Sequence, residues 1–438
     1  MPPAPTPVFP RYASLKLWAA LAVLVVAGAW AATRPAPLHE DEAIYAAWAR
    51  AVANGTDPWL AATPVDKPPL YLYALAGVFR LAGARPTSAR GLNVIVMAGV
   101  ALLLARLSRR PAVSVALLTS TPLIPFMAGS AFTDPLMLLF VLLGWLAARE
   151  GQPGRAGLAC GLAVAVKPTA LFLWPVVAAA SRRTHAPADR WRRFAVGTAV
   201  PLALVWAWDA SRTAPPWWLL GWRAYGTLGR APSTWAAWWP PVALSLGASW
   251  VAMGWRAPAR APAEFNAVRA LLVAWVPLHA ALGFQPWDRY LLPLAPLIAW
   301  MAGETAPSHR LVTALAVNGG LLLLLFSLPH PLLAGRDGRW EGIEEMATLL
   351  KAVPGPIYHR EMGRPFAFYA PELDDRLVWL PAEAFPPPGA VWAGRRDDRE
   401  CVHPIWQAPS SGLAICTAWP SGRAENLVTS SHFRTMWK

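Results

Sequence analysis

The sequence predicts an all-α polytopic membrane protein with about eleven transmembrane helices, followed by a small C-terminal α/β domain. Of its 438 residues, 55% are hydrophobic and 15% are charged, whereas a soluble domain usually carries about 25% charged residues. Long apolar windows recur from Leu15 to Leu328, more than one globular core needs. We expect helices, because a helix satisfies its own backbone hydrogen bonds in lipid and these windows are too long for barrel strands.

Eleven apolar windows give the expected spans in chain order. They cover residues 15–32, 91–105, 112–128, 135–148, 155–166, 168–180, 194–208, 235–254, 270–284, 288–302 and 311–328. The two windows on either side of Lys167 could instead form one kinked element. We expect the first window to be a retained helix, because no clean small-residue cleavage site follows it and further spans come after it.

The arginine-rich loops predict the orientation in the membrane. Residues 106–110, 181–193 and 255–269 are rich in arginine and alternate with loops of the other set. The positive-inside rule places them in the cytoplasm, so the N-terminus is expected inside and residues 335–438 outside. A formal charge of +14 often indicates nucleic-acid binding. We exclude that class, because the arginines form short clusters between apolar runs.

The first outer loop, residues 33–90, is expected to contain two helices. Residues 41–54 place Ile44, Trp48 and Val52 on one stripe, which predicts an amphipathic helix. Residues 70–81 are apolar but short for a span, so we expect a helix lying in the membrane interface after Pro68 and Pro69.

The chain changes character after Leu328, which predicts a domain boundary between residues 1–334 and residues 335–438. The tail is polar and Pro-rich. Residues 342–353 have helical spacing, and the segments "GPIYHR", "LVWL" and "AVWAGR" read as short strands. Cys401 and Cys416 fall in this expected extracytoplasmic domain, where disulfides persist, and we predict that they pair.

Five ionisable residues stand singly near the outer ends of the expected spans: Asp41, Glu42, Lys67, Asp134 and Arg289. Charges near the hydrocarbon boundary are costly unless they are paired or solvated, which makes them functional candidates. The alternative is that they are helix caps and snorkelling groups, and two carboxylates at a helix start also complement the helix dipole. For Lys167 we favour a helix cap over a phosphate contact.

Four segments carry a family resemblance: "HEDEAIYAAWARAV" (39–52), "DKPPLYLY" (66–73), "AFTDPLMLLF" (131–140) and "PWDRYLLPLAPLIAW" (286–300). Together they resemble the GT-C membrane glycosyltransferases, nearest to the superfamily of protein O-mannosyltransferases and aminoarabinose transferases (glycosyltransferase family 39). The resemblance covers residues 15–328, and its most specific parts are the Asp-Glu pair and the Lys-Pro-Pro. The tail matches no family in this way.

The resemblance implies transfer of a sugar from a polyprenyl-phosphate donor to an acceptor on the outer face of the inner or plasma membrane. It places Asp41 at the catalytic centre, with Asp134 completing the cavity. Lys67 is expected on the donor phosphate, with Tyr290 and Arg289 beside it. We assign catalysis to the two aspartates and substrate binding to four residues: Glu42, Lys67, Arg289 and Tyr290.

The resemblance leaves metal dependence, substrate and alternatives open. Some relatives use a divalent cation (Mg²⁺ or Mn²⁺), and Asp41, Glu42, Asp134 and His39 could form an oxygen-rich site. Oxygen ligands alone are a weak signature, so we assign no metal ligands. The acceptor can be a glycolipid, a polysaccharide or a protein. The alternatives are a transporter or flippase of a lipid-linked sugar and a non-catalytic membrane scaffold.

Overall fold

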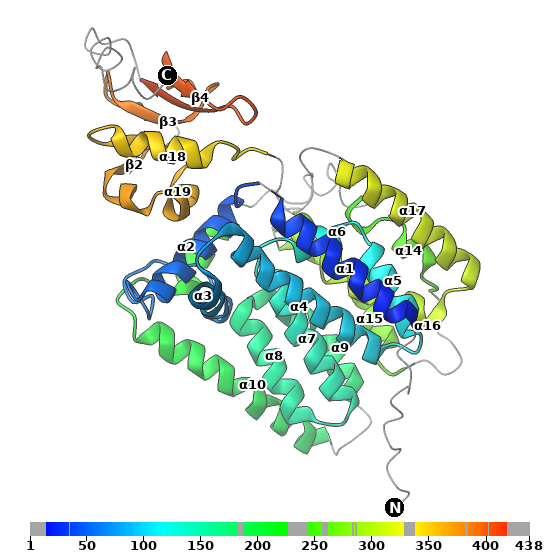
Figure 1. The fold of residues 1–438 in the computed structure, drawn as a ribbon. Coiled ribbons are helices and arrows are strands. Elements are labelled where there is room, and N and C mark those ends of the chain that lie inside the picture. Colours follow the sequence, from blue (N-terminus) through cyan, green and yellow to red (C-terminus); the bar gives the residue numbers. More distant parts are fainter. Residues whose placement is uncertain are drawn as a thin grey trace, which may run out of the picture. The chain divides into compact units, whose positions relative to one another are not determined.

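The computed structural model describes residues 15–34, 36–181, 187–226, 244–255, 262–282, 284, 287–327, 338–381, 384–401 and 403–417. The chain divides into two compact units (Figure 1). The first consists of residues 1–34 and 49–334, and the second of residues 35–48 and 335–438. The expected boundary at residue 335 leaves residues 35–48 with the membrane region, whereas their contacts group them with the tail.

The first unit is built from helices. Helix α2 (Glu40–Asn54) starts in the second unit and ends in the first. The others are α1 (Leu15–Thr33), α3 (Leu70–Ala82), α4 (Pro86–Leu107), α5 (Pro111–Ser120), α6 (Leu123–Ala128), α7 (Asp134–Arg149), α8 (Pro153–Val166), η1 (Pro168–Leu173), α9 (Trp174–Ala180), α10 (Pro187–Ala210), α11 (Trp217–Gly226), α14 (Ser249–Ala252), α15 (Phe265–Ala281), η3 (Asp288–Leu291), α16 (Leu294–Thr305) and α17 (Ser308–Ser327).

Three expected spans are interrupted, and these expectations were wrong in detail. The window 112–128 breaks between α5 and α6, where Pro122 follows the extended Thr121. The window 168–180 begins as the 3₁₀ turn η1 before α9. The window 288–302 begins as η3, and α16 starts only at Leu294. The part of the expected span 235–254 before residue 244 lies outside the described residues.

The packing of α8 against α10 depends on glycines. Helices α4, α7, α8 and α10 follow one another side by side (Figure 1). A Cβ atom on Gly157 would lie 2.0 Å from the Phe194 carbonyl oxygen, and one on Gly197 would lie 2.1 Å from the Gly154 oxygen. Such distances are far below van der Waals contact, so only glycine permits this approach.

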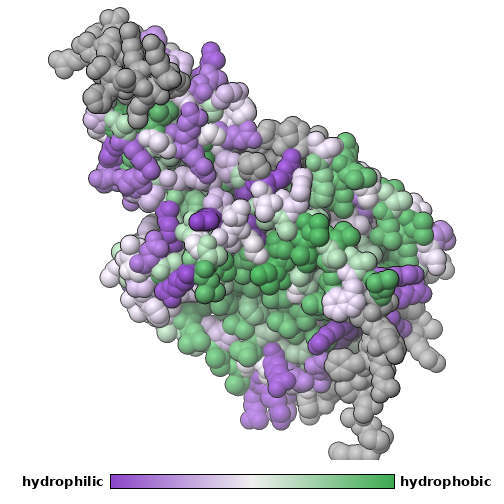
Figure 2. Space-filling model, viewed as in Figure 1, coloured by the Kyte–Doolittle hydropathy of each residue, from purple (hydrophilic) through white to green (hydrophobic). Residues whose placement is uncertain are grey.

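The surface of the first unit is strongly apolar. Figure 2 shows a continuous hydrophobic area over this unit and a mainly hydrophilic surface over the second. Large exposed apolar side chains include Val26 on α1, Leu204 on α10 and Leu323 on α17. Within the described ranges, α1, α4 and α17 are long and apolar enough to cross a membrane. The remaining spans are shorter or interrupted, so the number eleven stays a prediction.

The second unit contains a five-stranded mixed sheet in the order β2-β1-β3-β5-β4. Its strands are β1 (Ile357–His359), β2 (Leu377–Trp379), β3 (Val391–Arg395), β4 (His403–Gln407) and β5 (Leu413–Thr417), and its helices are α18 (Ile343–Ala352), α19 (Gly363–Tyr369) and η4 (Pro371–Arg376). β1 pairs in parallel with β2 and β3, whereas β5 pairs antiparallel with β3 and β4. The expected helix and three strands are all present, whereas β4, β5 and α19 were not expected.

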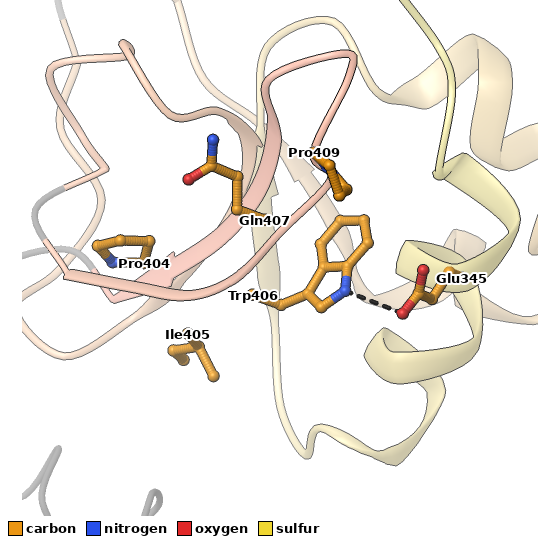
Figure 3. Close-up of a pocket in the computed structure, with 6 residues that line it drawn as sticks. All are labelled: Glu345, Pro404, Ile405, Trp406, Gln407 and Pro409. Atoms are coloured by element: carbon orange, nitrogen blue, oxygen red, sulfur yellow. Dashed lines mark hydrogen bonds between the residues drawn. The ribbon is translucent and has the colours of Figure 1, made fainter. Parts of the chain in front are cut away.

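The core of the second unit forms where α18 and α19 pack on the sheet. Ile343, Leu350, Phe366 and Ile415 are among its fully or almost fully buried side chains. Beside the edge strand β4 lies a cavity of about 440 Å³ (Figure 3), lined by Glu345, Pro404, Ile405, Trp406, Gln407 and Pro409. The indole Nε1 of Trp406 donates a hydrogen bond of 3.1 Å to Glu345 there.

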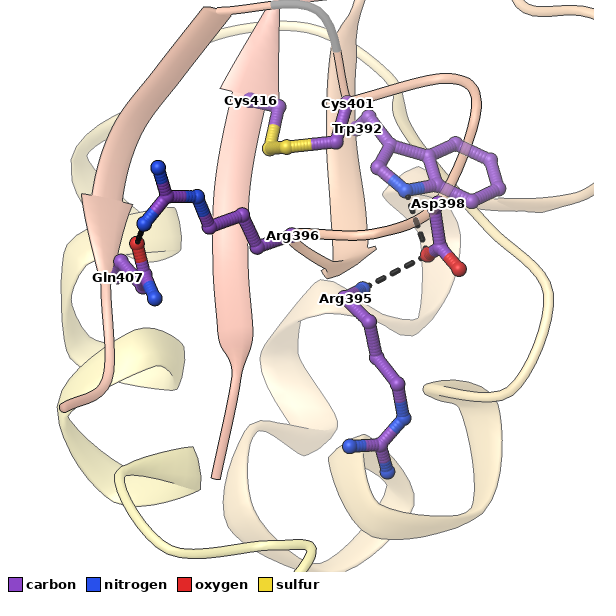
Figure 4. The surroundings of a disulfide bond; sticks show 7 residues. All are labelled: Trp392, Arg395, Arg396, Asp398, Cys401, Gln407 and Cys416. Atoms are coloured by element: carbon purple, nitrogen blue, oxygen red, sulfur yellow. Dashed lines mark hydrogen bonds between the residues drawn. A yellow bond between two sulfur atoms is a disulfide. The ribbon is translucent and has the colours of Figure 1, made fainter. Parts of the chain in front are cut away.

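The predicted disulfide between Cys401 and Cys416 is confirmed (Figure 4). Their Cα atoms are 5.0 Å apart, within the range that a disulfide can bridge. It ties the turn before β4 to β5. The same turn is held by the Asp398 carboxylate, which accepts hydrogen bonds from the Trp392 indole at 3.0 Å and from the Arg395 backbone at 2.7 Å.

Candidate active site

Asp134 lies at the start of α7, and the local sequence explains this position. Pro135 occupies the first turn, where its missing N–H costs nothing. A carboxylate at a helix N-terminus is also stabilised by the helix dipole. The side chain is buried, with 2% of its surface exposed, so it requires a charged partner.

Lys167 is that partner. Its Nζ lies 2.6 Å from Asp134 Oδ1, and only 6% of the residue is exposed. Lys167 ends α8 in an extended conformation, because the following proline disfavours helical geometry at the residue before it. The expectation of a helix-end position is therefore correct, but the ion pair with Asp134 was missed. A signal existed, since Lys167 and Lys67 are both followed directly by proline.

Tyr290 and Arg289 reach the same place from η3. The Lys167 ammonium lies 4.6 Å from the centroid of the Tyr290 ring. The Arg289 guanidinium lies 4.4 Å from the Trp287 ring and 5.0 Å from the Phe132 ring. Both arrangements are cation–π contacts, which gain strength where water is excluded.

The backbone of η3 is fixed from α15. The indole Nε1 of Trp275 donates a hydrogen bond of 2.9 Å to the Tyr290 carbonyl. The rings of Trp287 and Tyr290 stack at 5.7 Å with an interplanar angle of 25°. These contacts hold Arg289 and Tyr290 in a defined position although they lie in a short 3₁₀ turn.

Lys67 stands immediately before the two prolines that precede α3. It is 5% exposed, and its Nζ lies 2.8 Å from Asp66 Oδ2. The charges of Lys67 and Arg289 both act on the Lys167 ammonium. The cations Lys67, Lys167 and Arg289 therefore lie near one another in a largely buried region, beside the carboxylates of Asp66, Asp134 and Asp288. Three cations held close together are suited to an anionic ligand.

The loop that leads to Lys67 is clamped by a buried arginine, Arg212, which follows α10. Its guanidinium donates hydrogen bonds to the carbonyls of Leu60 at 2.8 Å and Thr63 at 2.7 Å. It also lies 3.0 Å from the Asp209 carboxylate. Leu60 has a φ of 53°, in the left-handed region that a branched side chain rarely adopts. Arg212 was not singled out from the sequence.

Asp41 and Glu42 belong to the second unit, where α2 begins. The Glu42 carboxylate accepts a hydrogen bond of 2.9 Å from the His39 backbone, and the Asp41 N–H faces His39 Nδ1 at 3.4 Å. This is the reciprocal pattern of a capping box, with histidine in the N-cap position. Asp41 lies 2.7 Å from the guanidinium of Arg364. His39 is therefore a helix cap.

The carboxyl group beside Asp41 is perturbed. Burial raises the pKa of Glu40, and the negative charge of Asp41 raises it further, whereas Arg339 and Arg364 act in the opposite direction. Among the residues that the structure describes, no group of three or more His, Cys, Asp or Glu side chains is placed to hold a metal ion. Asp41, Glu42, Asp134 and His39, which could have formed an oxygen-rich site, are therefore not grouped in this way.

A second polar cluster lies at the other end of α7. Arg149 contacts the Glu264 carboxylate and the Leu107 carbonyl, and the Trp145 indole donates to Glu264 at 3.2 Å. Arg149 and Asp134 are the last and first residues of the 16-residue helix α7, which places them about 22 Å apart along the helix axis. The loops after Leu107 and before Phe265 thus share one end of the bundle, as the arginine pattern predicts, and the Asp134 cluster lies at the opposite end.

Two solved structures resemble this chain over most of its length. Aminoarabinose transferase ArnT from Cupriavidus metallidurans bound to undecaprenyl phosphate is 15% identical, with a TM-score of 0.58 over 93% of this chain and 99% of that chain. The apo state of the same protein is 16% identical, with a TM-score of 0.53 over 92% and 96%. No protein-family model and no curated protein sequence matches. The chain therefore has the GT-C fold that its motifs predict, and the match extends into the tail.

Proposed function

From this GT-C fold, we propose that the chain is an inner-membrane or plasma-membrane glycosyltransferase. It transfers a sugar from a polyprenyl-phosphate donor to an acceptor hydroxyl at the outer membrane face. The observation that carries the proposal is the buried ion pair of Lys167 and Asp134, with the charges of Lys67 and Arg289 close enough to act on Lys167. In the same fold, the ArnT structure is bound to undecaprenyl phosphate, which is the class of ligand that such a group would hold.

The cations account for the leaving group. When the bond between sugar and phosphate breaks, the departing polyprenyl phosphate gains negative charge. Lys67, Lys167 and Arg289 are fixed cations in a largely buried region, so they stabilise this charge without reorganising. Asp134 holds Lys167 in place by its ion pair and completes the cavity. The Tyr290 hydroxyl contributes a donor beside the phosphate.

Asp41 is proposed as the base. Direct displacement at the sugar carbon requires the acceptor hydroxyl to lose its proton, and a carboxylate within hydrogen-bond reach accepts it. Glu42 is expected to act on substrate binding through the position of the helix start that it caps. Mg²⁺ or Mn²⁺ remains a candidate cofactor from the family resemblance, but no step of this mechanism requires it.

The first test uses undecaprenyl phosphate alone, because the sugar is not identified. We expect this lipid to raise the melting temperature of the purified protein, since a ligand that binds only the folded state stabilises it. Undecaprenol, which lacks the phosphate, should not. Lys67→Gln should lose the stabilisation, whereas Asp41→Asn should keep it. Lys351→Gln is the matched control, since Lys351 forms a half-exposed ion pair with Glu372 in the second unit.

The second test is transfer in proteoliposomes, with labelled sugars supplied on undecaprenyl phosphate and a membrane extract as acceptor. We expect Asp41→Asn to lower kcat by roughly 10²-fold if it is the base. Lys67→Gln should lower kcat/KM by roughly 10²-fold or more. If the wild-type protein binds undecaprenyl phosphate but transfers no sugar, the enzyme proposal falls.

The broken helices support one alternative, a flippase or transporter of a lipid-linked sugar. Discontinuous helices at a charged site are typical of transporters, and Lys167 and Tyr290 both lie at such breaks. Flipping of a fluorescent polyprenyl-phosphate sugar in proteoliposomes without acceptor distinguishes the two functions. Flipping that survives Asp41→Asn, with no transfer by the wild type, would establish the transporter.

A further inference from the structure

The start of α2 is held by the C-terminal tail. Residues 35–48 and the tail form one unit although some 300 residues separate them. The Leu38 N–H donates a hydrogen bond of 2.7 Å to the Tyr369 hydroxyl. Three residues later, Asp41 Oδ1 accepts a hydrogen bond of 2.7 Å from Arg364. Both tail residues belong to the short helix α19.

The charges at the start of α2 explain why such a contact matters. Three consecutive carboxylates, Glu40 to Glu42, occupy its first turn. The capping box engages Glu42, and the helix dipole stabilises all three. Glu40 adds a negative charge beside Asp41, and both Arg339 and Arg364 from the tail counter it. The tail therefore supplies positive charge that this turn lacks within α2.

We propose that Arg364 is a positioning residue for Asp41, so that the tail forms part of the catalytic apparatus. This inference rests on the proposed role of Asp41 as the base. Arg364 fixes the direction of the carboxylate by a charge-assisted hydrogen bond, and Tyr369 fixes the backbone just before it. The acceptor hydroxyl thus meets a carboxylate whose orientation depends on α19.

The ion pair between Arg364 and Asp41 is too exposed to contribute much to stability, so its effect on catalysis can be measured separately. The Arg364 side chain is 47% exposed and that of Asp41 is 14% exposed. Such a solvent-exposed pair contributes little to the free energy of unfolding, so Arg364→Gln should leave the melting temperature nearly unchanged. A misdirected catalytic group, by contrast, costs activity out of proportion to stability.

The experiment measures sugar transfer by the full-length protein in proteoliposomes. We expect Arg364→Gln to lower kcat about tenfold with little change in the donor KM, because the donor phosphate is bound elsewhere. Arg364→Lys keeps the charge and should restore part of kcat. Arg396→Gln is the matched control, since Arg396 is an exposed tail arginine with one side-chain partner, Gln407 at 2.8 Å. Its kcat should equal that of the wild type.

A double-variant comparison provides a readout that a purely structural role would not change. If Arg364 acts through Asp41, adding Arg364→Gln to Asp41→Asn should lower kcat no further. Multiplication of the two effects, or wild-type kcat in Arg364→Gln, would overturn the proposal.

Hydrogen exchange separates failure of this inference from failure of the proposed function. Backbone amides of residues 38–44 should exchange faster in Arg364→Gln and in Tyr369→Phe than in the wild type, and not in Arg396→Gln. This measurement requires no substrate. If exchange is faster in both variants but the wild type transfers no sugar, the contact of α19 with the start of α2 stands and the proposed enzymatic function is rejected. Unchanged exchange in both variants would reject the anchoring itself.

Discussion

At the scale of single residues, the pair of Asp134 and Lys167 is difficult to explain by stability alone. Both residues are almost fully buried, and a buried ion pair often contributes no more stability than apolar residues of similar volume. Breaking one by removing a partner is strongly destabilising, by about 3–5 kcal/mol. The partner of Lys67, Asp66, has 17% of its side chain exposed, against 3% for Asp134. Loss of Lys67 therefore leaves a less buried charge unpaired, which makes Lys67 the more informative position for testing phosphate binding.

Arg212 is the residue expected to control the position of Lys67. It binds the carbonyls of Leu60 and Thr63, and Thr63 lies only four residues before Lys67. A strained residue such as Leu60 persists only where surrounding contacts determine its conformation. The Arg212 guanidinium provides two such contacts in this loop, its hydrogen bonds to the Leu60 and Thr63 carbonyls.

We predict that Arg212→Lys raises the donor KM several-fold and lowers the free energy of unfolding by about 1–3 kcal/mol, because lysine cannot reproduce the planar set of donors. Arg149→Lys is the control. Arg149 also joins a carboxylate and a carbonyl, but at the other end of α7. It should show a comparable loss of stability, measured by thermal unfolding, with an unchanged donor KM. Equal KM values in the two variants would refute the positioning role.

At the scale of helices, the contact between α8 and α10 sets how closely the bundle packs. Gly197 faces the backbone of α8, where a Cβ would lie 2.1 Å from the Gly154 oxygen and 2.9 Å from the Leu158 nitrogen. Backbone atoms cannot move aside as a flexible side chain can, so a methyl group here must separate the two helices.

We predict that Gly197→Ala lowers the free energy of unfolding by at least about 1–3 kcal/mol, the usual cost of overpacking. Gly91 in α4 is the control, because a Cβ atom added there would meet nothing within 4 Å. Gly91→Ala should be neutral or stabilising by up to about 1 kcal/mol, since alanine favours helix. Thermal unfolding in detergent measures both. A Gly197→Ala protein as stable as Gly91→Ala would show that the helices do not approach this closely.

The helix pattern shows what the sequence could and could not predict. Uninterrupted apolar runs gave α1, α7 and α17 to within three residues, because hydrophobicity and length are local properties. They placed the starts of α4 and α10 five and seven residues too late, because these helices begin with polar residues. The break at Lys167 was predicted, because the charged residue and the following proline interrupt the apolar run. The breaks at Thr121 and Leu292 were missed, since apolar residues continue around them and only the backbone changes direction. Strand β4 was missed because it contains a proline, which disfavours a strand interior, and β5 was missed as well.

The same distinction between local and tertiary information applies to the candidate site. Asp134, Lys67 and Tyr290 lie in recognisable motifs, so the sequence selected them as candidates, and their roles stay predictions. The partners are remote: Lys167 lies 33 residues from Asp134, and Arg364 lies 323 residues from Asp41. Such pairings depend on tertiary structure, which periodicity and composition do not encode.

At the scale of the whole molecule, the predicted orientation in the membrane assigns one end of the helical unit to the cytoplasm and the tail to the outside. Two arginine-rich loops, the one after Leu107 and the one that ends at Glu264, meet at the Arg149 end of α7. The Asp134 cluster lies at the other end of this helix. If the former end is cytoplasmic, the site faces outward. The tail is then extracytoplasmic, and its disulfide is a natural marker of that compartment.

The disulfide therefore tests both topology and stability. In spheroplasts, a membrane-impermeant maleimide should label neither Cys401 nor Cys416 until a membrane-impermeant reductant is added, after which the partly exposed Cys401 should react and the fully buried Cys416 should not. Cys160, buried in α8, is the internal control and should stay unlabelled throughout. Labelling of Cys401 only after the cells are lysed and reduced would place the tail inside.

The double variant Cys401→Ser, Cys416→Ser should lose about 3 kcal/mol of unfolding free energy, the loop-closure contribution for a separation of 15 residues. Reductant should lower the melting temperature of the wild type to that of the double variant, and leave that of the double variant unchanged, because only the wild type has a crosslink to lose.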